Sequence, residues 1–107
     1  MVLVEDTIYN WVRSRISRRV PCVISYNYYS GLLEFASMGS EEVLDVGKLA
    51  KPSIAEVSGI VKRAIEGEYG ELRLAGASFC EEAYENERVR ARFFASLGVV
   101  RITVVPK

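Results

Sequence analysis

The strongest alternation of hydrophobic and polar positions lies in residues 87–105, ERVRARFFASLGVVRITVV. One set of alternate positions is apolar and the other carries arginines, with Phe94 as the only exception. The apolar set is Val89, Ala91, Phe93, Ala95 and Leu97, and the opposite set is Arg88, Arg90, Arg92 and Ser96. A strand places alternate side chains on opposite faces, so this pattern predicts a half-buried strand whose arginines face water.

A second alternating run follows Gly98 and is rich in β-branched residues. Val100, Ile102 and Val104 alternate with Arg101 and Thr103. Two such runs separated by a glycine predict an antiparallel hairpin.

A helix is the alternative for residues 78–97. Ser78 and Glu81 form a capping-box pattern, the segment is rich in helix formers, and Gly98 would be the C-cap. On a helical wheel, however, Glu87 and Arg90 fall inside the apolar arc. We prefer the strand, and the choice between strand and helix decides the fold.

The rest of the chain predicts two helices and further strands. A helix is expected over residues 7–19, with Asp6 as N-cap and Pro21 as its stop, and another over 52–66, ended by Gly67. Strands are expected over 22–29 and 32–38, around a turn at Ser30-Gly31, and over 71–77. Residues 39–49 leave room for one short strand, and the apolar start at 2–4 is an edge strand or a tail. The predicted apolar stripes are Ile8, Trp11, Val12, Ile16 and Val20 in the first helix, and Ile54, Val57, Ile60, Val61, Ala64 and Ile65 in the second.

One glycine and three tyrosines add detail to this outline. Gly59 inside the second helix costs about 1 kcal/mol relative to alanine and suggests close approach of another backbone. The tyrosines at 26, 28 and 29 are expected to pack across strands, with base stacking as the less favoured alternative.

Composition limits the classes of protein to consider. The 107 residues are enough for a single domain over 1–107, and 14 basic residues balance 14 acidic ones. Zero net charge argues against a dedicated nucleic-acid binder.

No apolar run approaches the roughly 18 residues that span a bilayer, and no signal peptide is recognised. We therefore expect a cytoplasmic protein with no membrane association.

The sequence contains no catalytic or metal-binding motif. It has no histidine, and Cys22 and Cys80 stand alone, which disfavours a zinc site and a Ser-His or Cys-His nucleophile. The two cysteines are expected to be small buried hydrophobic residues. We therefore expect no enzymatic activity, no cofactor and no metal.

Arginines cluster in two segments. Candidate contacts to phosphates or to an acidic partner are Arg15, Arg18, Arg19, Arg88, Arg90 and Arg92. In the first helix, the same residues would also complement the negative end of the helix dipole.

The segment VPCVISYNYYSGLLEFAS resembles the first hairpin of the roadblock family. Cys22 stands where glycine is usual, and the chain lacks the closing helix of that family. The matching residues are Val20, Pro21, Val23, Gly31, Leu32, Leu33, Ala36 and Ser37. The resemblance implies an α+β fold of order α-β-β-α-β-β-β, with a mostly antiparallel five-stranded central sheet and helices on its faces.

The roadblock resemblance also implies a non-enzymatic dimeric adaptor that binds a protein partner such as a small GTPase. The homodimer seam is then expected along the helix 52–66 and the strand 71–77, where two edge strands would pair. The residues proposed for this seam are Ile54, Val57, Ser58, Val61, Leu72 and Leu74.

The helical alternative leads to a different family. Residues 51–94 are then similar to the Alba family of archaeal chromatin and RNA-binding proteins, with order β-α-β-α-β and an N-terminal extension. The matching features are Gly47-Lys48, Lys51-Pro52, Gly67 and the RARF sequence at Arg90–Phe93. This resemblance implies nucleic-acid binding, with Lys48 and Lys51 as candidate phosphate contacts.

Overall fold

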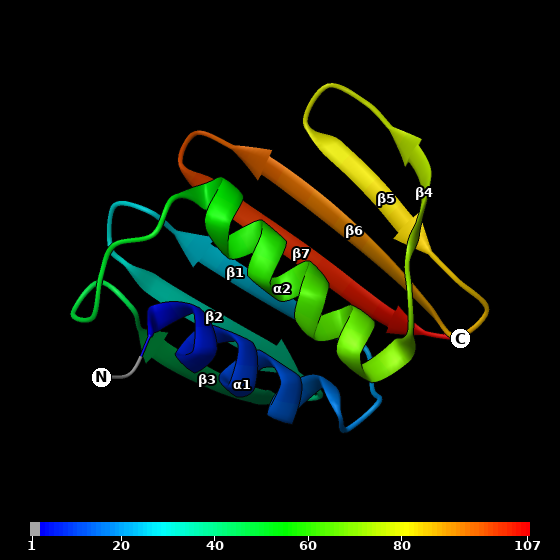
Figure 1. Ribbon diagram of the computed structural model, residues 1–107, viewed down its shortest axis with the longest axis horizontal. Coiled ribbons are helices and arrows are strands. Elements are labelled where there is room, and N and C mark those ends of the chain that lie inside the picture. The colour runs from blue at the N-terminus through cyan, green and yellow to red at the C-terminus, as the bar shows by residue number, and fades with distance from the viewer. Residues whose placement is uncertain (1–2) are drawn as a thin grey trace.

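The computed structural model describes residues 3–107, which fold as an α+β protein on one sheet (Figure 1). Its two helices are α1 (Val4–Ile16) and α2 (Ile54–Tyr69). Its strands are β1 (Cys22–Asn27), β2 (Leu32–Ser37), β3 (Ser40–Asp45), β4 (Arg73–Ala77), β5 (Glu81–Glu85), β6 (Val89–Ser96) and β7 (Val99–Pro106). Every neighbouring pair is antiparallel, in the order β3-β2-β1-β7-β6-β5-β4.

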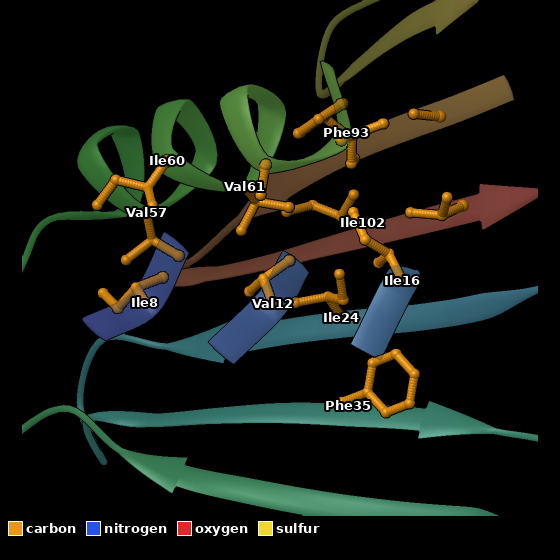
Figure 2. Packing of buried hydrophobic residues seen from close by; sticks show 14 of the residues in the cluster. Ile8, Val12, Ile16, Ile24, Phe35, Val57, Ile60, Val61, Phe93 and Ile102 are labelled. Atoms are coloured by element: carbon orange, nitrogen blue, oxygen red, sulfur yellow. The ribbon is translucent and has the colours of Figure 1, made fainter. Parts of the chain in front are cut away.

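Both helices lie side by side on one face of the sheet, which we call the covered face (Figure 1). The opposite face, which we call the open face, carries no helix or strand of the described residues (Figure 1). The core fills the space between the helices and the covered face, where Ile8 and Val12 of α1 meet Val57 of α2 above Ile24 and Ile102 (Figure 2). The prediction of helices on both faces of the sheet is therefore wrong, because the two apolar helix stripes share a single core.

The segment 87–105 forms the predicted hairpin. Val89, Ala91 and Phe93 are buried on the covered face, while Arg90 and Arg92 are exposed on the open face. Residues 81–85 and 89–96 are strands, so the helical alternative is wrong, and with it the second helix that the Alba-like order requires.

Leu97 departs from this pattern. It lies in the turn beside Gly98, with φ of 51° and 79° respectively, and its side chain is 91% exposed. The apolar set of this strand therefore ends before Leu97, because the chain has already turned.

The sheet has seven strands, not the five predicted. The two additional strands are β3, which pairs with β2 and occupies the place left for a short strand in residues 39–49, and β5, which pairs with β6. Residues 81–85 read EEAYE and are good helix formers, so their propensity conceals a strand that is held by its neighbours.

Helix limits also differ from the prediction. α1 already includes Val4 and ends at Ile16, well before Pro21, while Val2 lies outside the described residues. α2 begins after Ser53, whose hydroxyl accepts a hydrogen bond from the Glu56 amide at 3.1 Å, and it runs on to Tyr69.

Gly67, not Gly59, marks the close approach within the fold. A Cβ atom at Gly67 would lie 2.5 Å from the Tyr9 hydroxyl of α1, so glycine lets the two helices approach each other there. A Cβ atom at Gly59 would have the Arg63 guanidinium at 3.9 Å, and within the described chain no backbone of another element lies within 4 Å of it.

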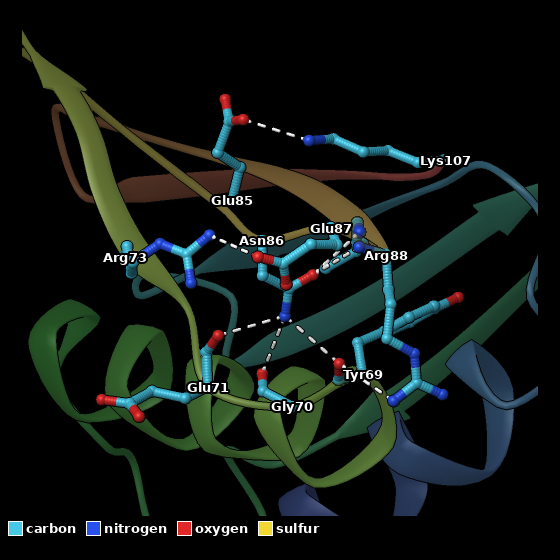
Figure 3. Close-up of polar contacts among 10 residues, drawn as sticks. Tyr69, Gly70, Glu71, Arg73, Glu85, Asn86, Glu87, Arg88 and Lys107 are labelled. Carbon is cyan, nitrogen blue, oxygen red and sulfur yellow. Dashed lines mark hydrogen bonds and ion pairs between the residues drawn. The ribbon is translucent and has the colours of Figure 1, made fainter.

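Asn86, in the turn between β5 and β6, ties the sheet to the end of α2 (Figure 3). Its buried amide nitrogen donates to three carbonyls at 3.1 to 3.2 Å, and its oxygen accepts from two backbone amides at 2.8 and 3.1 Å. The carbonyls belong to Tyr69, Gly70 and Glu71, and the amides to Arg88 and Val89. One side chain therefore satisfies the backbone where α2 ends and the chain enters β4.

Candidate functional site

No element of residues 3–107 covers the open face of the sheet, and strand register arranges its side chains in rows. Directly paired residues on neighbouring strands point to the same face. One row runs across six strands and consists of Glu81, Phe94, Arg101, Ser25, Glu34 and Val43. The next row consists of Ala83, Arg92, Thr103, Val23, Ala36 and Glu41.

Charge is segregated across these rows. The basic side chains stand on β6 and β7, and are Arg90, Arg92 and Arg101. The acidic side chains on the other side of β1 stand on β2 and β3, and are Glu34, Glu41 and Asp45. β1 separates the two groups with small uncharged residues.

The two groups do not neutralise each other within one chain. Arg92 pairs at 3.4 Å with Glu81 of β5, on the far side from the acidic strands. Among residues 3–107, no carboxylate lies within 4.0 Å of Arg90 or Arg101. The open face is therefore bipolar, with unmatched charge on both halves.

The predicted arginines of the first helix lie on the other side of the molecule and are paired. Arg15 and Arg18 contact Glu42 of β3 at 3.0 and 3.2 Å, and Arg19 contacts Glu68 of α2 at 3.0 Å. The Arg15 guanidinium also lies 4.2 Å from the centre of the Trp11 ring. These arginines join α1 to the sheet edge and to α2, so they are not free for an acidic partner.

Arg88 also departs from its predicted position. It precedes β6, and its guanidinium donates to the Tyr69 carbonyl at 3.4 Å, at the end of α2. Of the six arginines proposed from the sequence, only Arg90 and Arg92 lie together on the open face.

The predicted dimer seam lies largely inside the monomer. Val57 and Val61 are 0% exposed and Leu72 is 6% exposed, so a seam built on them would have to open the core. Ile54 and Ser58 are half-buried on α2, and Leu74 is 59% exposed on β4.

Edge-to-edge pairing meets physical obstacles at both ends of the sheet. β4 is five residues long and contains a bulge between Leu74 and Gly76. β3, at the other edge, carries Glu41, Glu42 and Asp45. Short, bulged and charged edges are the features by which sheets avoid edge pairing.

A groove lies on the covered face, between α2 and the hairpin of β4 and β5. Its volume is about 450 Å³, and α2 contributes Ser58, Gly59 and Lys62 to its wall. Tyr84 and Phe93 form its floor, with ring centroids 5.6 Å apart and edge to face.

The hairpin side of this groove carries exposed apolar residues. Phe79, in the turn of the hairpin, is 101% exposed and lines the groove, and Leu74 of β4 stands exposed on the same face. Nothing in the local sequence marks Phe79 as exposed, because an aromatic residue beside Cys80 equally suits a buried position.

The tyrosines divide into one core residue and two turn residues. The Tyr26 hydroxyl is buried and donates to the Pro52 carbonyl at 2.7 Å, as expected for packing. Tyr28 and Tyr29 lie in the turn between β1 and β2, with ring centroids 5.8 Å apart. Lys51, a candidate phosphate contact, lies over the Tyr28 ring at 4.8 Å.

Lys48, the other candidate phosphate contact, pairs weakly with Asp45 at 3.9 Å.

Burial is the main cause of the raised pKa values of the thiol and hydroxyl groups in the interior. Cys22 is buried, and burial raises the pKa of its thiol to about 11, while Cys80 is half-buried and both thiols are free. Burial also raises the pKa of Tyr26, Tyr69 and Tyr84. Within residues 3–107, no three metal-ligating side chains gather, and no helix is long and apolar enough to cross a membrane.

Three comparisons with known proteins add no relative. No protein-family model, no curated protein and no solved structure matches this chain. The functional argument therefore depends on the two surfaces, the open face and the groove.

Proposed function

We propose that the chain is a non-enzymatic, homodimeric adaptor that binds a protein partner. The observation that carries the proposal is the groove on the covered face, where exposed apolar side chains surround a space that no element of the described chain fills. Exposed apolar patches of this kind are typical of protein interaction sites.

The size of the groove favours one helix as the occupant. Seven strands at about 4.8 Å spacing span about 29 Å between the outer strands. Helices packed side by side lie about 10 Å apart, so a sheet of this width accepts three. α1 and α2 occupy two of these places, and the third, over β4 and β5, is the groove (Figure 1).

The lining of the groove indicates the chemistry of that helix. Tyr84 and Phe93 offer an apolar floor and Phe79 an apolar rim, and Lys62 and Glu82 supply charges on opposite walls. An amphipathic helix of a partner, with its apolar face inward, satisfies both features. The resemblance to the roadblock family suggests a small GTPase as the class of partner.

Nucleic-acid binding, the alternative considered from the sequence, gains little support from the arrangement of charges. Arg15 of α1 and Arg19 after it are paired with Glu42 and Glu68, and Arg90 and Arg92 lie on the other face. A surface that follows a phosphate backbone needs unpaired cations in a continuous stripe.

A library of amphipathic helical peptides tests the groove without knowledge of the natural partner. We expect selected peptides to bind the wild-type protein and to shift the amide resonances of Ser58, Lys62 and Tyr84. Phe79→Lys should weaken their binding at least about tenfold, because it places a charge on the apolar rim. Tyr29→Lys, an exposed change in a distant turn, serves as the control.

Two outcomes would contradict the proposal. Selected peptides could shift resonances elsewhere, or they could bind the two lysine variants equally well. A panel of purified small GTPases, each with GDP and with a GTP analogue, tests the partner class separately.

A further inference from the structure

We infer that the open face binds a second copy of this chain, sheet against sheet, about a twofold axis that runs along β1. The inference rests on the homodimer of the proposed function and identifies its seam. It replaces the seam expected from the sequence, whose valines are in the core.

The strand order sets which strands would face each other. A half turn about an axis lying along β1, in the plane between two sheets, exchanges the strands on either side of β1. β7 of one copy then faces β2 of the other, and β6 faces β3. These are the basic and the acidic strands of the open face.

The register shows that the charges match in position along the strands as well. Ser25 of β1 pairs with Arg101 of β7 on one side and with Glu34 of β2 on the other. Because Arg101 and Glu34 share a row, the half turn places Arg101 of each copy opposite Glu34 of the other.

The neighbouring row repeats this match one strand further out. Arg92 of β6 connects through Thr103 and Val23 to Ala36 and then to Glu41 of β3. The same half turn therefore places Arg92 opposite Glu41. A twofold interface contains each contact twice, so the two rows give four complementary pairs.

The uncharged positions are compatible with the same arrangement. Val23 and Ser25, which lie on the axis, are small and let the sheets approach. Phe94 comes opposite Val43, since both belong to the row of Arg101, and both are about half exposed in the monomer, at 45% and 56%. Two aligned sheets normally cross at about 30°, which long arginine side chains can accommodate.

The area agrees with a specific but modest interface. Five strands of about six residues cover about 24 by 20 Å on each copy, or roughly 500 Å² of sheet. Two copies together bury about 1,000 Å², near the lower limit for a specific interface. β4 and β5 lie outside the overlap, so the groove stays accessible in the dimer.

Charge reversal provides the test. Arg101→Glu places two carboxylates opposite each other at both symmetric contacts, and Glu34→Arg places two guanidiniums there. Both residues are exposed, and neither has an ion-pair partner in the described part of the monomer, so both variants should fold normally. Each variant alone should dimerise at least about tenfold more weakly than the wild type in sedimentation equilibrium.

Mixing the two variants gives the decisive measurement. In a heterodimer of Arg101→Glu with Glu34→Arg, both symmetric contacts again join opposite charges, so an equimolar mixture should recover the wild-type affinity. Arg63→Glu, the same change on the exposed side of α2, should dimerise like the wild type.

The outcomes separate the seam from the function. The wild type and both variants could all dimerise with the same affinity, whether each variant is alone or mixed with the other. In that case the proposed seam is wrong, but the proposed homodimer is retained. If the wild type remains monomeric up to millimolar concentration, both the seam and the homodimer are wrong. Peptide binding at the groove is measured independently of either result.

Discussion

Neighbouring residues of β7 show how differently the two faces of the sheet are built. Ile102 is 0% exposed and packs beneath the helices, while Arg101 beside it stands on the open face with no carboxylate within 4.0 Å among the described residues. In β3, Glu42 on the covered face binds Arg15 of α1 and Arg18 just beyond it, and Glu41 on the open face binds none of the described cations.

The difference lies in where each charge finds its partner. Charges at the margin of the covered face are matched within the chain, by residues brought together across the α1, α2 and β3 packing. On the open face, the arginines of β6 and β7 and the carboxylates of β2 and β3 are matched in position but not in contact, because β1 stands between them. An arginine with an ion-pair partner in the same chain stabilises the fold. An arginine without one remains available to another molecule.

The largest expected difference between the faces is in packing. Ile102→Ala should lower the free energy of unfolding by about 2–5 kcal/mol, because it leaves a cavity under both helices. Arg101→Ala should change it by no more than about 0.5 kcal/mol. Urea denaturation at a concentration where the protein is monomeric measures both. Equal losses would mean that the open face is packed in the monomer as well.

A smaller difference is expected in the response of stability to alkaline pH. Burial on the covered face raises the pKa of Cys22 from 9.0 to about 11. Between these values the unfolded chain has lost the proton that the folded chain still holds, so stability falls as pH rises. With about 1.4 kcal/mol for each pKa unit, the loss is on the order of 3 kcal/mol.

The control for this loss is Cys22→Ala, which removes the buried thiol. Tyr26, Tyr69 and Tyr84, whose pKa values are also raised, act in the same direction in both proteins. The variant should therefore lose less stability than the wild type between pH 9 and 11, as measured by denaturant midpoints. Identical slopes would show that Cys22 titrates as freely in the folded chain as in the unfolded one.

Sequence periodicity was sufficient to predict the elements that pack one apolar side against the core. The alternation after Glu87 predicted β6 and β7, and the stripes of Ile8 and Val57 predicted both helices. It failed for β5, whose EEAYE sequence favours a helix and which is a strand because β4 and β6 flank it. Gly67 was taken as a helix end, although it marks contact with Tyr9.

The candidate site was less accessible from sequence for a different reason. The arginines at 90 and 92 were recognised, but Arg101, Glu34 and Glu41 were not, because only strand register places them in shared rows. Register depends on which strands are neighbours, and the pairing of β1 with β7 joins segments about 75 residues apart. No local pattern records that pairing.

The two glutamates of β3 give a matched test of the charge argument. Glu42→Gln should destabilise the monomer by about 1–2 kcal/mol, since it removes the counter-ion of Arg15 and Arg18. The Nε of Arg15 is already buried without a hydrogen-bond partner, which leaves this guanidinium dependent on Glu42. Glu41→Gln should leave monomer stability unchanged and weaken only dimerisation. The reverse result would exchange the roles assigned to the two faces.

The smallest expected effect concerns Glu85, at the margin of the open face. A hydrogen bond from Lys107 at 3.0 Å is the largest cause that lowers the pKa of this carboxyl, with smaller contributions from Arg90 and Arg73 (Figure 3). Lys107→Met keeps the length of the side chain and removes its charge, so the pKa of Glu85 should rise toward its ordinary value. Because the pair is at the surface, stability should scarcely change.

Carboxyl carbon shifts followed by NMR across the acidic range measure that pKa, with Lys48→Met as a control that leaves it unchanged. The size of the rise is informative for the open face. Arg90 of β6 is the cross-strand neighbour of Glu85 in β5. A complete return of the Glu85 pKa to the ordinary value would show that the Arg90 guanidinium does not interact with this carboxylate. A partial return of this pKa would show that the positive charge of Arg90 still stabilises the Glu85 carboxylate. The basic half of the open face would then be partly neutralised at its outer margin. Arg101 would be its main charge available to a second copy of the chain.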